Sequence, residues 1–312
     1  MGHGSYRASD WAKLKESRGI NAGSTVNQLF SNQTMDDRYN PKFFETRESC
    51  DSDDSPNSTP IIIGLDVTGS MGYLAEEIAK NALNETVTQI YAKQPVTNPH
   101  ILCAAFGNHY DNAPLQVTQF EADIRVVEQL LDLWIERGGN GYSADTFVWY
   151  FAAKHTRIDS FQKRGKKGFL FTLGDDFCSE NLNYGTIYKI FNEKARDYTI
   201  KELIDMASEQ YELFHIITKP LGSSVEEDWK KLMPGRVALV DAKSLAYLPQ
   251  VIISIMQLSN GKPREEVLEQ WEEPMREAVK TAVKDVLPKK SHQGLFHSFK
   301  SDGQQAKKWW QF

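Results

Sequence analysis

The chain lacks the features that mark several common classes of protein. Its 312 residues contain only three cysteines, Cys50, Cys103 and Cys178, an odd number at wide spacing. This usage fits neither a disulfide framework nor a zinc site, and it favours a reducing compartment. No run approaches the roughly 20 apolar residues that a membrane helix needs, and the first residues lack the apolar segment of a secretory signal. We therefore expect a cytoplasmic protein without a membrane partner.

An excess of positive charge is also missing. The sequence has 36 lysines and arginines against 42 aspartates and glutamates, which gives a formal net charge of -6. Nucleic-acid-binding domains usually carry a basic face, so we expect no nucleic-acid partner. What the chain does have is 40% hydrophobic residues, which is enough for a substantial core.

Two polar extensions flank the apolar part of the chain. Residues 1–57 are rich in Ser, Asn and Asp, and we interpret them as an arm and linker. Residues 261–312 are expected to form a charged helix over 263–287, followed by a flexible basic tail that carries Trp309 and Trp310. Adjacent exposed aromatic residues usually mark a contact. The tail is therefore expected to pack on its own domain or to dock to a partner.

Between these extensions, residues 58–260 alternate short apolar runs with amphipathic segments. The runs that we expect to be strands are 61–67, 100–107, 114–120, 168–174, 211–218 and 236–241. Strands that alternate with helices indicate βαβ units and a parallel sheet. The third run follows the second closely enough to be its hairpin partner. The prediction is a Rossmann-like, doubly wound α/β fold, with a mostly parallel six-stranded sheet, one short antiparallel edge strand, and helices on both faces.

Besides the helix expected over 72–93, three helices expected within this domain are long. Residues 121–137 show an amphipathic pattern that stops at Gly138, and residues 186–209 are expected to be mainly helical. A third helix is expected over 244–258, with Pro249 inside it.

The first strand ends in an unusual polar stretch. In "IIIGLDVTGSMG" (61–72), an apolar strand leads into Asp66, Thr68 and Ser70, which are spaced by twos. Short polar residues of this kind also cap helices, and a helix is expected to begin at residue 72. Capping alone does not explain why oxygen-bearing residues recur in two other loops of the domain.

Those two loops supply further oxygen ligands. The stretch "LGDD" after strand 168–174 and the loop "RGGNGYSADT" (137–146) contain Asp175, Asp176, Asn140, Ser143, Asp145 and Thr146. The carboxyl ends of parallel strands share one edge of a sheet, where open α/β folds bind their ligands. Few charges and several hydroxyls suit a hard divalent cation. We expect Mg²⁺, with Mn²⁺ or Ca²⁺ as alternatives.

The order and spacing of the three loops resemble a known family. The stretch "DVTGS" (66–70) resembles the Asp-x-Ser/Thr-x-Ser motif of von Willebrand factor A domains, the first loop of their metal-ion-dependent adhesion site. "GGNG…S" is similar to the second loop of that site and "FTLGDD" to the third. The resemblance covers about residues 58–260. The continuation "TGSM" looks like the intracellular branch of the family, which includes the copines and bacterial and phage members.

The resemblance implies a part for each residue of the first and third loops. Thr68 and Ser70 would bind the metal through their hydroxyls, and Asp66 and Asp175 would act directly or through water. The third loop reads "GDD" where many members read "TDG". This departure makes Asp176 a supporting group or an alternative ligand.

In the second loop the resemblance leaves a choice open. The family usually has a Thr soon after the glycines, and this chain offers Ser143, Thr146 and Asn140. We choose Ser143.

The function implied by the resemblance is that of a non-enzymatic protein-binding module. The metal would complete its coordination with an Asp or Glu from a partner protein. Intracellular members of the family often act as adaptor or assembly subunits, sometimes beside AAA+ ATPases of the MoxR type, and this partner rests on family analogy alone. The sequence shows no Ser-His-Asp or Cys-His set for nucleophilic catalysis, which agrees with a binding role.

The alternative is a Mg²⁺-dependent phosphotransferase or phosphatase that resembles the haloacid dehalogenase superfamily. Asp66 would then be the nucleophile and Mg²⁺ would clamp the phosphoryl group. "DVTGS" is similar to the Asp-Lys-Thr-Gly-Thr of its P-type ATPase branch. Against this reading, Thr68 stands where most members carry a general-acid Asp. Cys178 and Ser179 stand where the acidic loop usually has a further Asp.

Overall fold

The structure is a computed structural model of the chain. It describes residues 8–21, 23–69, 83–136, 143–178, 181–218, 224–241 and 243–287. The predicted ligand Ser70, the alternative ligand Asn140 and the tail with Trp309 and Trp310 lie outside the described residues. The helix expected from residue 72 is described from Leu83 onward.

A six-stranded sheet forms the centre of the molecule. Its order is β4-β3-β2-β6-β7-β8. The strands are β2 (Thr59–Asp66), β3 (Pro99–Phe106), β4 (Leu115–Val117), β6 (Gly168–Gly174), β7 (Tyr211–Ile217) and β8 (Val237–Leu239). Every pair is parallel except β3 with β4, which runs antiparallel at the edge. The predicted fold class is therefore confirmed, including its short antiparallel edge strand.

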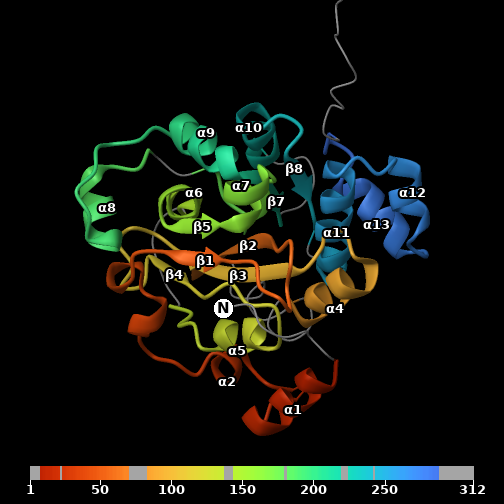
Figure 1. The fold of residues 1–312 in the computed structure, drawn as a ribbon, viewed down its shortest axis with the longest axis horizontal. Helices are drawn as coiled ribbons and strands as arrows, with labels where there is room; N and C mark the ends of the chain where they lie inside the picture. The colour runs from red at the N-terminus through yellow and green to blue at the C-terminus, as the bar shows by residue number, and fades with distance from the viewer. Residues whose placement is uncertain are drawn as a thin grey trace, which may run out of the picture.

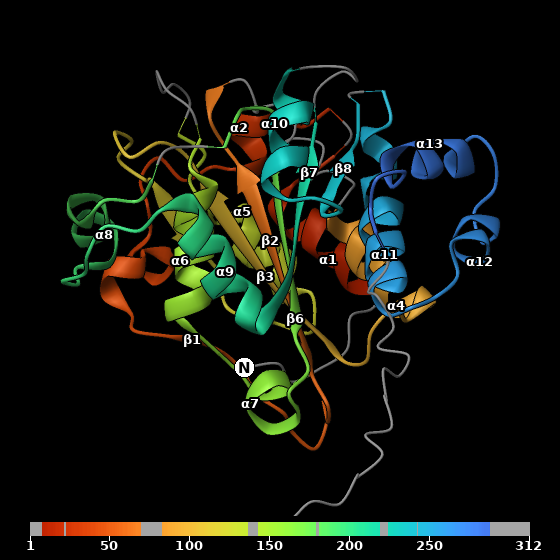
Figure 2. The same ribbon diagram turned by 90° about the horizontal axis from the view of Figure 1, so that it is seen from above.

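Helices cover both faces of this sheet (Figures 1 and 2). One face carries α4 (Leu83–Lys93), α5 (Arg125–Leu131) and α11 (Leu248–Ser259), and the other carries α6 (Asp145–Lys154), α8 (Tyr184–Phe191), α9 (Ile200–Gln210) and α10 (Ser224–Leu232). Strand β2 lies between the two layers, with alternate residues in each hydrophobic cluster. A strand buried on both faces needs apolar side chains at nearly every position, which explains the run "IIIGL". In the described part of the chain, no helix is long and apolar enough to cross a membrane.

The N-terminal arm packs onto the domain. Helices α1 (Ala8–Arg18) and α2 (Val26–Leu29) and two short 3-10 turns, η1 (Asp37–Tyr39) and η2 (Pro41–Phe43), lead into β1 (Arg47–Ser49). Trp11, Leu14 and Tyr39 are buried in the cluster beneath α5. Strand β1 pairs in parallel with β5 (Thr156–Ile158), and α7 (Asp159–Arg164) follows. The boundaries at residues 57 and 260 stay a prediction.

A buried histidine joins this arm to the central sheet. His100, at the start of β3, has Ser49 Oγ 3.0 Å from its Nδ1 and Ser55 Oγ 2.8 Å from its Nε2. All three side chains are buried. Pairing both ring nitrogens removes the cost of burying them, so these contacts hold the arm against β3.

In the structure, one of the long helices predicted from the sequence is shorter than expected, and another is divided into two helices. The helix expected over 121–137 ends at Leu131, because the Gln116 side chain bonds the backbone of Trp134 through both N–H (3.0 Å) and C=O (2.7 Å). The segment 186–209 forms two helices, and the first ends at Asn192, whose φ of 54° is left-handed.

Two proline positions correct the expectations for the C-terminal helices. Pro249 lies in the first turn of α11 and does not interrupt it. A proline there removes no helical hydrogen bond, so α11 runs on from it without a break. The charged helix expected over 263–287 is two helices, α12 (Arg264–Glu269) and α13 (Met275–Ala282). Pro274 stands at the start of α13 and prevents one continuous helix.

The close packing of β2 against β6 gives a test of the fold. A Cβ added at Gly168 would lie 2.6 Å from Pro60 Cγ and 2.7 Å from the Pro60 carbonyl oxygen. We expect Gly168→Ala to lower the free energy of unfolding by about 2 kcal/mol, because backbone must move to relieve the overlap. Urea denaturation measures this change.

The control is Gly185→Ala in α8, where the added Cβ meets only Asn183 Oδ1, at 3.3 Å. That variant should be as stable as the wild type or slightly more stable, since Ala favours helix. Equal stability of the two variants would contradict the packing described for Gly168.

Candidate metal centre

The direction in which successive strands are added to the sheet reverses between β2 and β6. From β2 the chain continues to β3 and β4 on one side, and it returns to the other side with β6, β7 and β8. The two strands are parallel neighbours, with Leu65 opposite Leu173, so Asp66 and Gly174 end at the same level. Ligands of open α/β sheets bind at such a switch point, beyond the carboxyl ends of the strands.

Asp66 is held at this point by hydrogen bonds that, among the described residues, reach one of its two carboxylate oxygens. The residue is fully buried. Its Oδ1 accepts hydrogen bonds from the Thr68 amide (2.8 Å) and the Thr68 hydroxyl (2.7 Å). Its Oδ2 is buried and makes no hydrogen bond with a described residue. Thr68 thus fixes the orientation of the carboxylate and leaves Oδ2 for another partner.

The surroundings of Asp66 disfavour its charged form. Burial raises the pKa of Asp66 to about 7, although the Thr68 hydroxyl and amide and the Ser143 hydroxyl act in the opposite direction. The negative charge of Asp145 adds to the increase. Asp66 has no ion pair with a lysine or arginine among the described residues. A cation at Oδ2 would reverse this balance, since it favours the ionised carboxylate.

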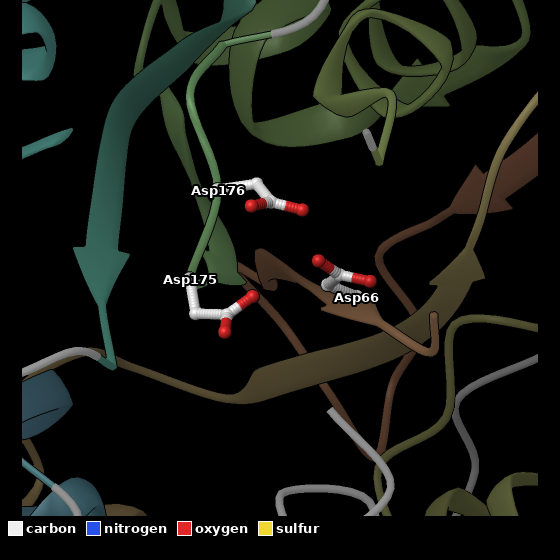
Figure 3. A group of neighbouring side chains, drawn as sticks. All are labelled: Asp66, Asp175 and Asp176. Atoms are coloured by element: carbon white, nitrogen blue, oxygen red, sulfur yellow. The ribbon is translucent and has the colours of Figure 1, made fainter. Parts of the chain in front are cut away.

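Asp175 and Asp176 bring two further carboxylates to Asp66. One oxygen from each of the three residues lies within 4.8 Å of the others. Figure 3 shows the three carboxylates facing a common space between the ends of β2 and β6. The loop that carries them is fixed by Trp229, whose Nε1 donates to the Asp176 carbonyl (2.9 Å). It is also fixed by Thr218, whose amide donates to the Gly174 carbonyl (3.0 Å).

The second loop approaches the same place from the start of α6. Ser143 is buried, and its hydroxyl favours the ionised form of Asp66 and so lowers the pKa of that carboxyl. The Ala144 amide next to it donates to the Gly107 carbonyl after β3 (3.1 Å), which anchors the loop to the sheet edge. Thr146 is buried one turn further on. Ser143, one of the two described candidates, thus contributes to the surroundings of Asp66.

A histidine beneath this loop was not expected to take part in the site. His215 Nδ1 lies 2.8 Å from Thr172 Oγ1 and 3.3 Å from Asp145 Oδ1. Its ring stacks on Trp229 at 3.5 Å between centroids. These contacts join β6, β7, α6 and α10 directly below the carboxylates. This pair could not be predicted, because Asp145 and His215 are 70 positions apart and His215 stands in no motif.

The donor set fits a hard divalent cation. The described donors are three carboxylates and the hydroxyls of Thr68 and Ser143, all of them oxygens. Oxygen ligands of this kind suit Mg²⁺, Mn²⁺ or Ca²⁺ and do not suit soft metals. The buried, unpartnered Oδ2 of Asp66 is the atom that a cation would satisfy.

Comparisons with known proteins give only a distant structural likeness. No protein-family model matches the chain, and no curated protein matches it. Two crystal structures of the pilus adhesin SpaC from Lactobacillus rhamnosus GG, one in an open conformation, are similar to it at 10% sequence identity with a TM-score of 0.46. The matches cover 68% and 69% of this chain, and 31% and 32% of the adhesin. The chain thus spans less than a third of the adhesin's length.

The uncompensated carboxylate predicts a stability effect. In EDTA at pH 8, we expect the free energy of unfolding of Asp66→Asn to be about 2 kcal/mol higher than that of the wild type, because the substitution removes a buried charge. The wild-type carboxyl is neutral in both the folded and unfolded states below about pH 4, so the two proteins should converge there. The advantage of the variant should develop as the pH rises from about 4 to about 7, where the folded wild type is progressively penalised. Thermal unfolding monitored by circular dichroism across this range measures it.

Asp205→Asn is the control, because Asp205 is an exposed carboxylate on α9 that pairs with Lys201. It should show no such pH-dependent gain. If Asp66→Asn is less stable than the wild type at every pH, the carboxylate is compensated in solution and the electrostatic account of the site is wrong.

Proposed function

We propose that this protein is a metal-dependent protein-binding module whose cation recruits an acidic side chain from a partner. The observation that carries the proposal is the buried Oδ2 of Asp66, which no described residue satisfies. It lies beside two further carboxylates at the switch point of the sheet. Of the predicted ligands, Asp66, Thr68, Ser143 and Asp175 belong to this edge, and Ser70 is proposed with them from the sequence.

The chemistry of the site supports recognition of an anion. When bound, a divalent cation would have its charge balanced by the carboxylates of Asp66 and Asp175, and the hydroxyl ligands, which are neutral, would leave it an exchangeable position. Mg²⁺ usually retains water ligands in such sites. A carboxylate from a partner can replace one of these waters, because it is a hard ligand like the cation's other ligands and carries the opposite charge to the cation. The partner is therefore expected to present an exposed Asp or Glu.

The groups around Asp66 support binding more than catalysis. His215 is buried and stacked beneath Trp229, so it is not placed to exchange protons with a bound molecule. Thr68 donates both of its described hydrogen bonds to Asp66 and orients it. A nucleophilic Asp66 would have to leave these bonds and reach a phosphorus atom from a fully buried position.

A titration with Mg²⁺, Mn²⁺ and Ca²⁺ separately tests the metal site. Isothermal calorimetry of the full chain should detect one bound cation, and Asp66→Ala should weaken its binding by about tenfold or more, since a charged ligand is lost. Asp205→Asn serves again as the control and should bind the cation as the wild type does. The absence of any metal-dependent heat or stabilisation would overturn the proposed site.

Capture of partners from a lysate tests the binding function. A protein retained by the wild type in Mg²⁺, but lost in EDTA and with Asp66→Ala, is the expected result. Substituting the acidic residues of that protein one at a time should identify the one that completes the site. Release of phosphate from phosphate esters that requires Mg²⁺ and disappears in Asp66→Asn would instead establish the phosphotransferase alternative.

A further inference from the structure

A second buried charge lies outside the candidate metal centre. Arg47, the first residue of β1, is only 5% exposed. Its Nη2 donates to the carbonyls of Arg38 and of Val117, the latter at 3.2 Å. Its Nε is buried and without a hydrogen-bond partner, and the described residues provide no carboxylate within ion-pair distance of the guanidinium. Burying an ionised group is costly unless an opposite charge accompanies it.

The contacts that Arg47 does make leave its charge uncompensated. The guanidinium carbon lies 3.5 Å from the centre of the Phe44 ring, so one face of the cation rests on an aromatic surface. Burial lowers the pKa of Arg47 to about 10, which still leaves it charged at neutral pH. The two carbonyl bonds explain how Arg47 attaches the arm to β4. They do not explain why a cation is used there.

Arg47 lines a cavity of about 310 Å³ between the arm and the sheet edge. Tyr39, Phe43 and Phe44 give the cavity an aromatic wall, and Gln119 and Gln129 give it two amides. Phe43 is 60% exposed, although large aromatic side chains are usually covered. The volume is at the lower end of the range for small-molecule sites.

The other charged residues of the cavity favour an anion with a single negative charge. Arg38 is exposed and already occupied by Asp36 (2.7 Å) and Asp132 (3.8 Å). Asp37 also lines the cavity and opposes a second negative charge. One available cation with an acidic neighbour suits a single negative charge better than a phosphate dianion. The aromatic wall suits a ligand with an apolar body.

We propose that this cavity binds a small monocarboxylate with an aromatic or apolar group, with the carboxylate at Arg47 and the apolar group against Phe43 and Phe44. The carboxylate supplies the charge that the fold omits, and the ring covers the exposed face of Phe43. Two sources present this chemistry, a free aromatic acid and the C-terminal residue of a peptide. This site is independent of the metal centre and of the function proposed for it.

Matched pairs of acid and amide test the proposal without altering the protein. Ligand-observed NMR on the full chain should show binding of phenylacetate and N-acetylphenylalanine. It should show binding of phenylacetamide and N-acetylphenylalaninamide weaker by about tenfold or more, because the charge-assisted bond is lost. Tighter binding of N-acetylphenylalanine than of phenylacetate would identify a chain end as the source, and the reverse order would identify a free acid. If acids and amides bind equally, or if none binds, the proposal is wrong.

Variants locate the binding. Arg47→Met keeps the apolar stem and should abolish the preference for the acids, and Phe43→Ala, at an exposed position, should weaken both acids by a few fold. Arg157→Gln on the neighbouring strand β5 is the control, since Arg157 is exposed and pairs with Glu48 away from the cavity. If Arg47→Met does not fold, Phe43→Ala and the amide pairs still decide the question. Unchanged binding in Phe43→Ala, with the acids still preferred, would place the ligand elsewhere and overturn the assignment.

Discussion

The rest of the candidate site depends on the buried carboxylate of Asp66, whose Oδ2 is satisfied by none of the residues that the structure describes. A buried carboxylate without a partner is unfavourable by several kcal/mol in its ionised form. The fold nevertheless holds it at the end of its central strand, where β3 and β6 pair on either side. Neither neighbour supplies a cation. The protein thus carries an electrostatic cost at the one position where α/β sheets bind ligands.

The contacts around Asp66 orient one of its carboxylate oxygens and leave the other without a hydrogen bond from a described residue. Thr68 occupies Oδ1 with two hydrogen bonds, and Asp175 and Asp176 bring more negative charge to the open side. Further hydrogen bonds would have stabilised the carboxylate without a cation. The arrangement instead leaves the carboxylate to be neutralised by protonation, as its raised pKa indicates, or by a cation. Beneath it, the Thr172–His215–Asp145 contacts and the Trp229 ring keep the loops in place without adding a positively charged lysine or arginine.

The sequence predicts the fold and the residues of the site better than it predicts the local details. Buried parallel strands require continuous apolar runs, and such runs are visible without any structure. The meeting of Asp66 with Asp175 and Asp176 follows from the rule that parallel strands end at one edge. The end of α5 could not be predicted, because it depends on Gln116, whose side chain bonds Trp134 18 positions away. The tripeptide "RES" of β1 likewise gives no sign that Arg47 is buried, since its burial is produced by η1, η2 and β4.

Asp66 and Arg47 are buried groups of opposite charge that do not pair with each other. A protein selected only for stability would be expected to compensate both, or to replace them with apolar residues of similar size. Each is instead held by neutral donors or acceptors that fix its orientation and leave its charge unbalanced, Thr68 in one case and two backbone carbonyls in the other. The same physical argument therefore applies twice in one chain. In both proposals the ligand supplies the missing charge, a cation at the sheet edge and an anion in the cavity under the arm.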